Sequence, residues 1–182
     1  MAKIRKFCAY RRLDRRPNTR FSKYSKLNYV RVRPVSKVVN YTVGHADQKF
    51  DNHLHLIATT DLQIRDNAIE SARMSANRVL EGTVGKEAYF FQTRMYPHHI
   101  MRENPLASGA GADRMSTGMA RSFGKPIGVA AQIRKGKKLF TVKVNNEHVD
   151  TAKKALKRAS YKIPCHCQII IERLGKKKAV EA

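Results

Sequence analysis

The sequence is poor in acidic residues, in cysteine and in long apolar runs. It has 14 acidic residues against 37 lysines and arginines, which gives a net charge of +23. Charge of one sign in such excess repels itself in a free compact protein, so we expect a polyanionic partner. Nucleic acid is the main candidate. An anionic membrane surface is the alternative, but the sequence shows no long basic amphipathic helix.

The lack of long apolar runs narrows the class of protein further. No stretch of 18 or more apolar residues occurs, so we expect no transmembrane helix and no membrane partner. The opening Met-Ala-Lys-Ile-Arg-Lys lacks the apolar core of a secretory signal, and we therefore expect a cytoplasmic protein. A chain of 182 residues is long enough for one domain with a sizeable core.

Cysteine is scarce, at three residues: Cys8, Cys165 and Cys167. An odd number in an intracellular chain argues against a disulfide framework. The run Cys165-His166-Cys167 raises the possibility of zinc, but zinc sites usually combine two matching ligand pairs, and Cys8 is remote in the sequence. We interpret the two cysteines as small apolar side chains at the start of a strand and predict no metal site.

Residues 1–34 hold nearly half of the net charge. They contain 12 lysines and arginines and one acid, with five aromatic residues between them. Arginine binds phosphate through paired hydrogen bonds, and aromatic rings stack on bases. A segment of this composition buries too little apolar surface to fold alone. We therefore predict an extended RNA-binding arm that becomes ordered on RNA, with a flexible basic tail as the alternative.

The rest of the chain alternates between strand and helix patterns. Strands are expected at residues 30–34, 38–43, 50–59, 88–96, 127–134, 139–144 and 168–171, the last inside the sheet. Apolar residues at helical spacing predict helices from residue 66 or 67 to about 80 and from 145 or 146 to about 160. Strands 127–134 and 139–144 should form a hairpin. This order predicts an α+β sandwich, with the helices on one side of a mixed sheet.

Regular periodicity stops between Asn104 and Gly128. This stretch holds five of the ten glycines and several arginines. A loop of about 20 residues in a compact domain is usually functional or disordered, and glycine allows close backbone approach. We expect a mobile loop at about 102–126 inside a globular domain, 35–172, which is followed by a basic tail, 173–182.

Enzyme motifs do not fit this loop. Gly109 and Gly111 lack the third glycine of a dinucleotide fingerprint, and the stretch ending at Lys125 has one residue too many for a phosphate-binding loop. Glu103 and Asp113 each neighbour an arginine that would hold the carboxylate ionised. We therefore expect no catalytic residues, no cofactor and no enzyme activity.

Three sub-motifs in the loop have a specific order and spacing: Gly109–Arg114 (Gly-Ala-Gly-Ala-Asp-Arg), Thr117–Met119 (Thr-Gly-Met) and Phe123–Pro126 (Phe-Gly-Lys-Pro). They resemble the central signature of a large-subunit ribosomal protein family, called L-ten-e in archaea, L-ten in eukaryotes and L-sixteen in bacteria. The similarity runs from the basic N-terminus to the strand near Ile169. The long N-terminal arm and the short C-terminal tail favour the archaeal form.

The resemblance implies a structural constituent of the large ribosomal subunit, with an α/β sandwich of the hammerhead type. It implies that the central loop reaches toward the peptidyl-transferase centre and that the protein helps position transfer RNA near the A site. The implied partners are large-subunit ribosomal RNA, A-site and P-site transfer RNA and neighbouring ribosomal proteins, with 5S ribosomal RNA as a further candidate and no homo-oligomer. The alternative function is a free RNA- or DNA-binding regulator.

The candidate RNA-binding residues come from the arm, from a histidine pair and from the turn near Gly136. They are Lys3, Arg5, Lys6, Arg11, Arg12, Arg15, Arg16, Arg20, Tyr24, Arg31, Arg33, His98, His99, Arg134, Lys135, Lys137 and Lys138. The loop residues expected near transfer RNA and the peptidyl-transferase centre are Arg102, Gly109, Gly111, Asp113, Arg114, Thr117, Gly118, Arg121 and Lys125. His53 and His55 share a strand face and are expected at a polar or RNA-facing surface. Four cations crowd the turn, which opposes folding unless phosphate lies opposite, although a solubilising turn is the alternative.

Overall fold

The computed structural model describes residues 4–13, 24, 26, 32, 34–104 and 124–173. Its strands are β1 (Thr42–Gly44), β2 (Asn52–Ala58), β3 (Leu62–Arg65), β4 (Tyr89–Thr93), β5 (His99–Glu103), β6 (Lys125–Ile133), β7 (Lys138–Val144) and β8 (Cys167–Arg173). Its helices are the short 3-10 turns η1 (Phe7–Ala9) and η3 (Asn146–His148) and the α-helices α1 (Asp66–Thr83) and α3 (Val149–Ser160).

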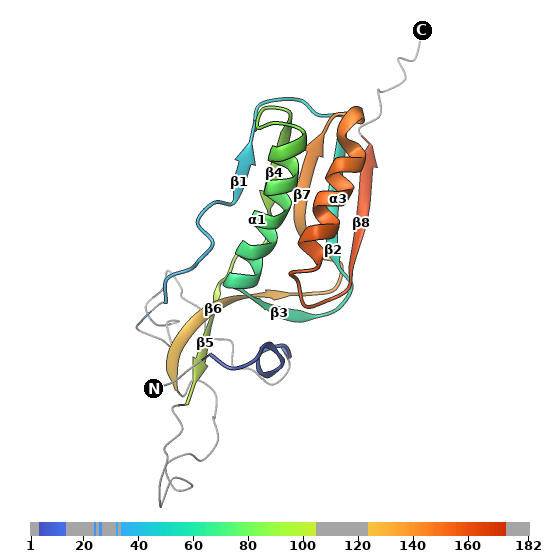
Figure 1. Ribbon diagram of the computed structural model, residues 1–182. Coiled ribbons are helices and arrows are strands. Elements are labelled where there is room, and N and C mark those ends of the chain that lie inside the picture. The colour runs from blue at the N-terminus through green and yellow to red at the C-terminus, as the bar shows by residue number, and fades with distance from the viewer. Residues whose placement is uncertain are drawn as a thin grey trace, which may run out of the picture.

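The strands form two sheets (Figure 1). The large sheet has five strands in the order β1-β4-β7-β2-β8, and the small sheet has three in the order β3-β6-β5. Every pairing in the described part of the chain is antiparallel. The α+β sandwich expected from the sequence is confirmed, and its strands are divided between two antiparallel sheets.

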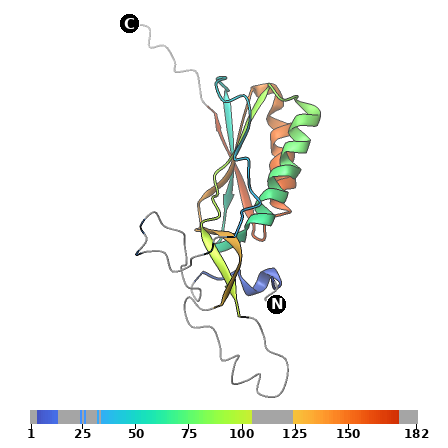
Figure 2. The same cartoon turned by 90° about the vertical axis from the view of Figure 1, so that its left-hand side faces the viewer.

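Helices α1 and α3 lie side by side on one face of the large sheet (Figure 2). Each presents a stripe of small and branched residues to that face; Ile69, Ala72, Ala76 and Leu80 of α1 are fully buried. Small side chains at a helix–sheet contact let the two layers approach closely. Both helices match the sequence prediction to within a few residues.

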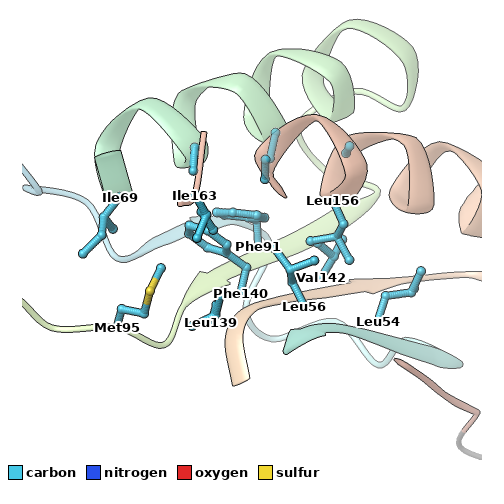
Figure 3. Packing of buried hydrophobic residues seen from close by; sticks show 14 of the residues in the cluster. Leu54, Leu56, Ile69, Phe91, Met95, Leu139, Phe140, Val142, Leu156 and Ile163 are labelled. Carbon is cyan, nitrogen blue, oxygen red and sulfur yellow. The ribbon is translucent and has the colours of Figure 1, made fainter. Parts of the chain in front are cut away.

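The main core fills the space between the helices and the large sheet (Figure 3). Phe91 of β4 stacks on Phe140 of β7 with ring centroids 5.4 Å apart, and Leu56 and Leu156 are fully buried in the same layer. Burial of apolar side chains contributes about 1.5–3 kcal/mol each relative to exposure. This cluster is therefore the principal source of stability.

The opposite face of the large sheet holds His55, which was expected at a polar surface. Instead its side chain is buried, because cross-strand neighbours surround it: Nδ1 lies 3.0 Å from the Thr141 hydroxyl and Nε2 lies 3.1 Å from Glu172. Lys138 also contacts Glu172, at 2.7 Å. Burial lowers the pKa of His55, so the folded protein favours the neutral ring. His53, on the same face, is half-buried.

Four other features differ from the sequence prediction. β6 and β7 do not form a hairpin, because β6 pairs with β3 and β5 whereas β7 pairs with β2 and β4. β8 is an edge strand rather than an internal one. Strand β3, whose Leu62 and Ile64 are buried, was not predicted at all. The described residues of the expected strand at 30–34, Val32 and Pro34, are not in a strand.

Candidate RNA interface

The small sheet buries several polar side chains. Gln63, His99, Arg102 and Glu103 are each at most 6% exposed. Buried polar groups are costly unless they are hydrogen-bonded or paired. The small sheet therefore depends on specific polar contacts, and the N-terminal segment (residues 4–13) supplies some of them.

The contacts among Arg5, Tyr10 and Glu103 form what we call the anchoring network. The Tyr10 hydroxyl donates to Glu103 Oε2 at 3.1 Å and accepts from the Arg5 backbone N–H at 3.0 Å. The Arg5 guanidinium pairs with Glu103 Oε1 at 2.6 Å. Tyr10 is 2% exposed, and burial raises the pKa of its hydroxyl. The network joins the N-terminal segment to the end of β5.

Main-chain contacts hold the same segment against β3. The backbone N–H of Gln63 donates to the Arg11 carbonyl at 3.1 Å, and the side-chain Nε2 of Gln63 donates to the Tyr10 carbonyl at 3.3 Å. Residues 4–13 are therefore packed on the protein body, which differs from the expected arm that becomes ordered on RNA. The physical reason is Tyr10, which the small sheet buries as a core residue.

The docked segment leaves its cations at the surface. Lys6, Arg11 and Arg12 are exposed, and Arg5 is half exposed beside Glu103. Tyr24 is 68% exposed. Backbone and tyrosine contacts fix the position of the segment while its cations face solvent. This arrangement is suited to phosphate contacts, which need charge at a defined place.

The base of the central loop is a strand pair. Arg102 lies in β5 with 6% exposure, and Lys125 is the exposed first residue of β6, so the regular strands extend further into the expected loop than the sequence indicated. Burial lowers the pKa of Arg102. Gly124 has φ +101°, and an added Cβ would lie 2.9 Å from the Glu103 carbonyl carbon and oxygen. Glycine is therefore required where the chain re-enters the small sheet.

The histidine pair is divided between two environments. His98 is half-buried, with Nδ1 3.1 Å from the Tyr96 carbonyl. His99 belongs to β5 and is 3% exposed. The expectation that both histidines lie at the surface is wrong for His99, because both faces of β5 are covered and all five of its residues are buried.

The turn between β6 and β7 exposes three of its four cations. Arg134, Lys135 and Lys137 are exposed, whereas Lys138 is half-buried against Glu172. The turn is held to residue 58 by backbone bonds, with the Gly136 N–H donating to the Ala58 carbonyl at 2.8 Å. A fixed backbone with free cationic side chains is again suited to a phosphate surface.

Many expected site residues lie outside the described residues. These are Lys3, Arg15, Arg16, Arg20, Arg31, Arg33, Gly109, Gly111, Asp113, Arg114, Thr117, Gly118 and Arg121. The same applies to residues 174–182 of the expected tail. Their roles stay predictions.

The cysteine pair carries two free thiols. The Cys165 and Cys167 sulfurs are 3.6 Å apart, and the hydrogen bond between them lowers the pKa of Cys165 and raises that of Cys167. Within the described residues, no three His, Cys, Asp or Glu side chains gather where they could hold a metal ion. In those same ranges, no helix is long and apolar enough to cross a membrane.

Sequence reasoning missed Glu103 and Tyr10 as structural partners. Glu103 was judged only as an acid beside an arginine, and Tyr10 only as one of several aromatic residues between cations. The contact spans 93 residues of sequence, so no local pattern could have indicated it.

Comparison with known proteins agrees with the loop motifs. A model of the ribosomal protein L16p/L10e family matches residues 16–170. The large ribosomal subunit protein uL16 of Methanococcus maripaludis is 43% identical over 162 residues, which cover 89% of this chain and 90% of the relative. The uL16 proteins of Methanococcus aeolicus and Staphylothermus marinus are 47% and 42% identical, over 81% and 83% of this chain and 86% and 87% of their own.

These matches agree with the exposed cations and with the absence of a catalytic constellation in the sequence. Members of the matched family are structural constituents rather than enzymes. The chain belongs to the L16p/L10e family of ribosomal proteins.

Proposed function

We propose that this protein binds large-subunit ribosomal RNA and helps position transfer RNA near the A site and the peptidyl-transferase centre. It works in the cytoplasm as a structural part of the large ribosomal subunit, with ribosomal RNA and neighbouring ribosomal proteins as its partners. Contacts to 5S ribosomal RNA and to A-site and P-site transfer RNA belong to the same proposal.

The observation that supports RNA binding best is the docked N-terminal segment. Tyr10 and the backbone of Arg11 fix it to the small sheet, while Lys6, Arg11 and Arg12 remain exposed. With a net charge of +23, such cations gain most of their binding energy from phosphate and release of counterions.

The first experiment is sucrose-gradient sedimentation of a cell lysate, in low salt and after a high-salt wash. We expect the protein to migrate with the large subunit and to resist the wash. A protein that stays at the top of the gradient in both conditions would favour the free regulator and contradict the proposal.

A sharper variant neutralises Lys6, Arg11 and Arg12 to glutamine. We expect reduced incorporation into subunits with an unchanged fold, because none of these side chains is buried. Deletion of residues 1–20 is a poorer test, since it also removes Tyr10 from the core. Arg78→Gln, which removes one exposed cation from α1, serves as the matched control.

The proposed positioning of transfer RNA is tested separately from RNA binding. Arg114 lies in the Gly109–Arg114 motif of the loop, outside the described residues. We expect Arg114→Ala to slow A-site transfer RNA accommodation while subunits still incorporate the protein. Normal accommodation in that variant would remove the support for a positioning role of Arg114 and leave RNA binding by the N-terminal segment untouched.

A further inference from the structure

The outer side of α3 carries a second group of cations, separate from the sites above. Its members are exposed and lie on the helix or just after it: Lys153, Lys154, Lys157, Arg158 and Lys162. We call this set the α3 face. The opposite side of the helix is apolar and buried, with Ala152, Ala155, Leu156 and Ala159 against the core. The cations are therefore directed away from the protein body.

Helix α1, which packs beside α3, provides an internal comparison. Its sequence has three acids and two arginines, and Arg73 pairs with Glu70 at 2.9 Å. Helix α3 has four cations and one acid, Asp150, which contacts Lys153 at 3.0 Å. That pair is exposed and contributes little. The two helices lie in the same layer but differ in charge. A need for solubility would apply to both helices, so it does not explain the excess of cations on the α3 face.

The helix dipole explains only part of this charge. Lys157 and Arg158 lie in the last turn, where cations are favourable. Lys154 lies in the middle of the helix, four residues before Arg158, and like charges at that spacing destabilise a helix by about 0.2–0.5 kcal/mol. Among the described residues, Lys154, Lys157 and Arg158 form no salt bridge within 4.0 Å. An external anion would relieve this repulsion.

The C-terminal end of α3 leads toward the N-terminal segment. A hollow of about 320 Å³ is lined by Arg11, Thr60, Ile163, Pro164, Cys165 and His166. Arg11 thus borders the loop that follows α3. Tyr161, 71% exposed, lies between Arg158 and Lys162 in sequence. Cations with an exposed aromatic ring among them are typical of an RNA-binding surface.

We propose that the α3 face binds the phosphate backbone of ribosomal RNA, as a second contact surface beside the N-terminal segment. This inference rests on the proposed function, because it assigns a surface to the same RNA partner. The contact is electrostatic: Lys154, Lys157 and Arg158 replace counterions along the RNA.

The test measures binding of the full-length protein to purified, deproteinised large-subunit ribosomal RNA over a range of salt concentrations. Each lost phosphate contact lowers the slope of log affinity against log salt by about one. The variant Lys154→Gln/Lys157→Gln/Arg158→Gln should therefore lower the slope by about three, and Lys157→Gln by about one. The matched control is Arg78→Gln, which removes one exposed cation from α1.

An unchanged slope in the triple variant would overturn the inference, as would an equal loss in Arg78→Gln, since net charge alone would then account for the effect. Unchanged RNA binding together with lost subunit incorporation would identify an acidic protein neighbour as the partner instead. If circular dichroism shows that the triple variant is unfolded, the salt slopes of Lys157→Gln and Arg78→Gln are compared instead, and equal slopes would overturn the inference. Failure of the unaltered protein to bind this RNA would contradict the proposed function itself.

Discussion

The two sheets of this protein are stabilised by different kinds of contact. The large sheet and its helices enclose an apolar core of leucine, valine, phenylalanine and alanine side chains. The small sheet joins that core through Leu62, Ile64, Ala131 and Ile133, but its separate buried cluster of Tyr10, Met101 and Ala130 lies beside the anchoring network with Arg5 and Glu103. The large sheet and its helices thus form the main scaffold, whereas the part of the small sheet farthest from them is completed by the N-terminal segment.

The small sheet, rather than the large one, adjoins two of the regions proposed to contact RNA. The N-terminal segment with its exposed cations packs on the small sheet, and the strands of that sheet form the base of the central loop. Regions that contact ligands are often drawn from the less stable part of a protein. The comparison predicts global effects for substitutions in the large sheet and local effects in the small one.

The largest effect is expected for Phe91→Ala. Removal of a ring stacked on Phe140 leaves a cavity in the main core, and such changes cost about 3–5 kcal/mol. Urea denaturation should show the loss as a lower midpoint with every spectroscopic probe. Met74→Ala, on the exposed side of α1, should leave the midpoint nearly unchanged. A small loss in Phe91→Ala would contradict the scaffold role of the large sheet.

Gly124→Ala should have an intermediate effect. The residue has φ +101° and its new Cβ would meet the Glu103 carbonyl, so we expect a cost of about 1–3 kcal/mol. Hydrogen exchange should speed up in β5 and β6 and stay unchanged in β4 and β7. Gly82→Ala is the matched control, because no atom lies within 4 Å of its added Cβ. Uniformly faster exchange in both sheets would show that the sheets do not behave separately.

Tyr10→Phe tests the anchoring network with a smaller change. It keeps the ring and removes the hydroxyl that joins Arg5 to Glu103, at a cost of about 0.5–1.5 kcal/mol, or more if Glu103 stays buried without it. Limited proteolysis should cleave the N-terminal segment faster, while the urea midpoint of the large sheet changes little. Equal protease resistance in the variant and the unaltered protein would mean that the hydroxyl does not hold the segment.

The smallest expected effect is a pH dependence in the large sheet. Burial lowers the pKa of His55 in the folded state, so its contribution to stability is present above its unfolded pKa of 6.5 and is lost as the pH falls below that value. His55→Gln should flatten the fall in urea midpoint as the pH drops below 6.5. Met74→Ala, an exposed position without a titratable group, should not. Identical pH profiles for all three proteins would show that His55 does not titrate on unfolding.

The sequence predicted those elements whose patterns are local. The alternating Leu54 and Leu56 indicated β2, and the spacing of Ile69, Ala72 and Ala76 indicated α1. The short β3 was missed because four residues carry too little periodicity. The prediction of a β6–β7 hairpin was wrong. It rested on the tendency of strands that are adjacent in the sequence to pair, whereas β6 pairs with β3 and β7 with β4, both distant in the sequence.

For the RNA interface, the sequence indicated charge but not burial. It identified Lys6, Arg11 and Arg134 as cations, and the structure places all three at the surface. It could not show that Arg102 and His99 are buried in β5, since both faces of this strand are covered by parts of the chain that are distant in the sequence. The residues of the α3 face form a basic stretch in the sequence. Comparison with α1, which lies beside α3 and carries more acids, showed that this charge is specific to one helix.

The passage of the chain from β6 in one sheet to β7 in the other has a consequence for synthesis. All strands of the small sheet have left the ribosome's exit tunnel once Ile133 has emerged, but the large sheet needs β8, which ends 40 residues later at Arg173. At about 5–20 residues per second, that interval lasts about 2–8 s. A nascent chain in this interval exposes the edge of β2 that β8 later covers. The last strand made is thus the one that closes the scaffold, and a chain released before it is vulnerable to aggregation.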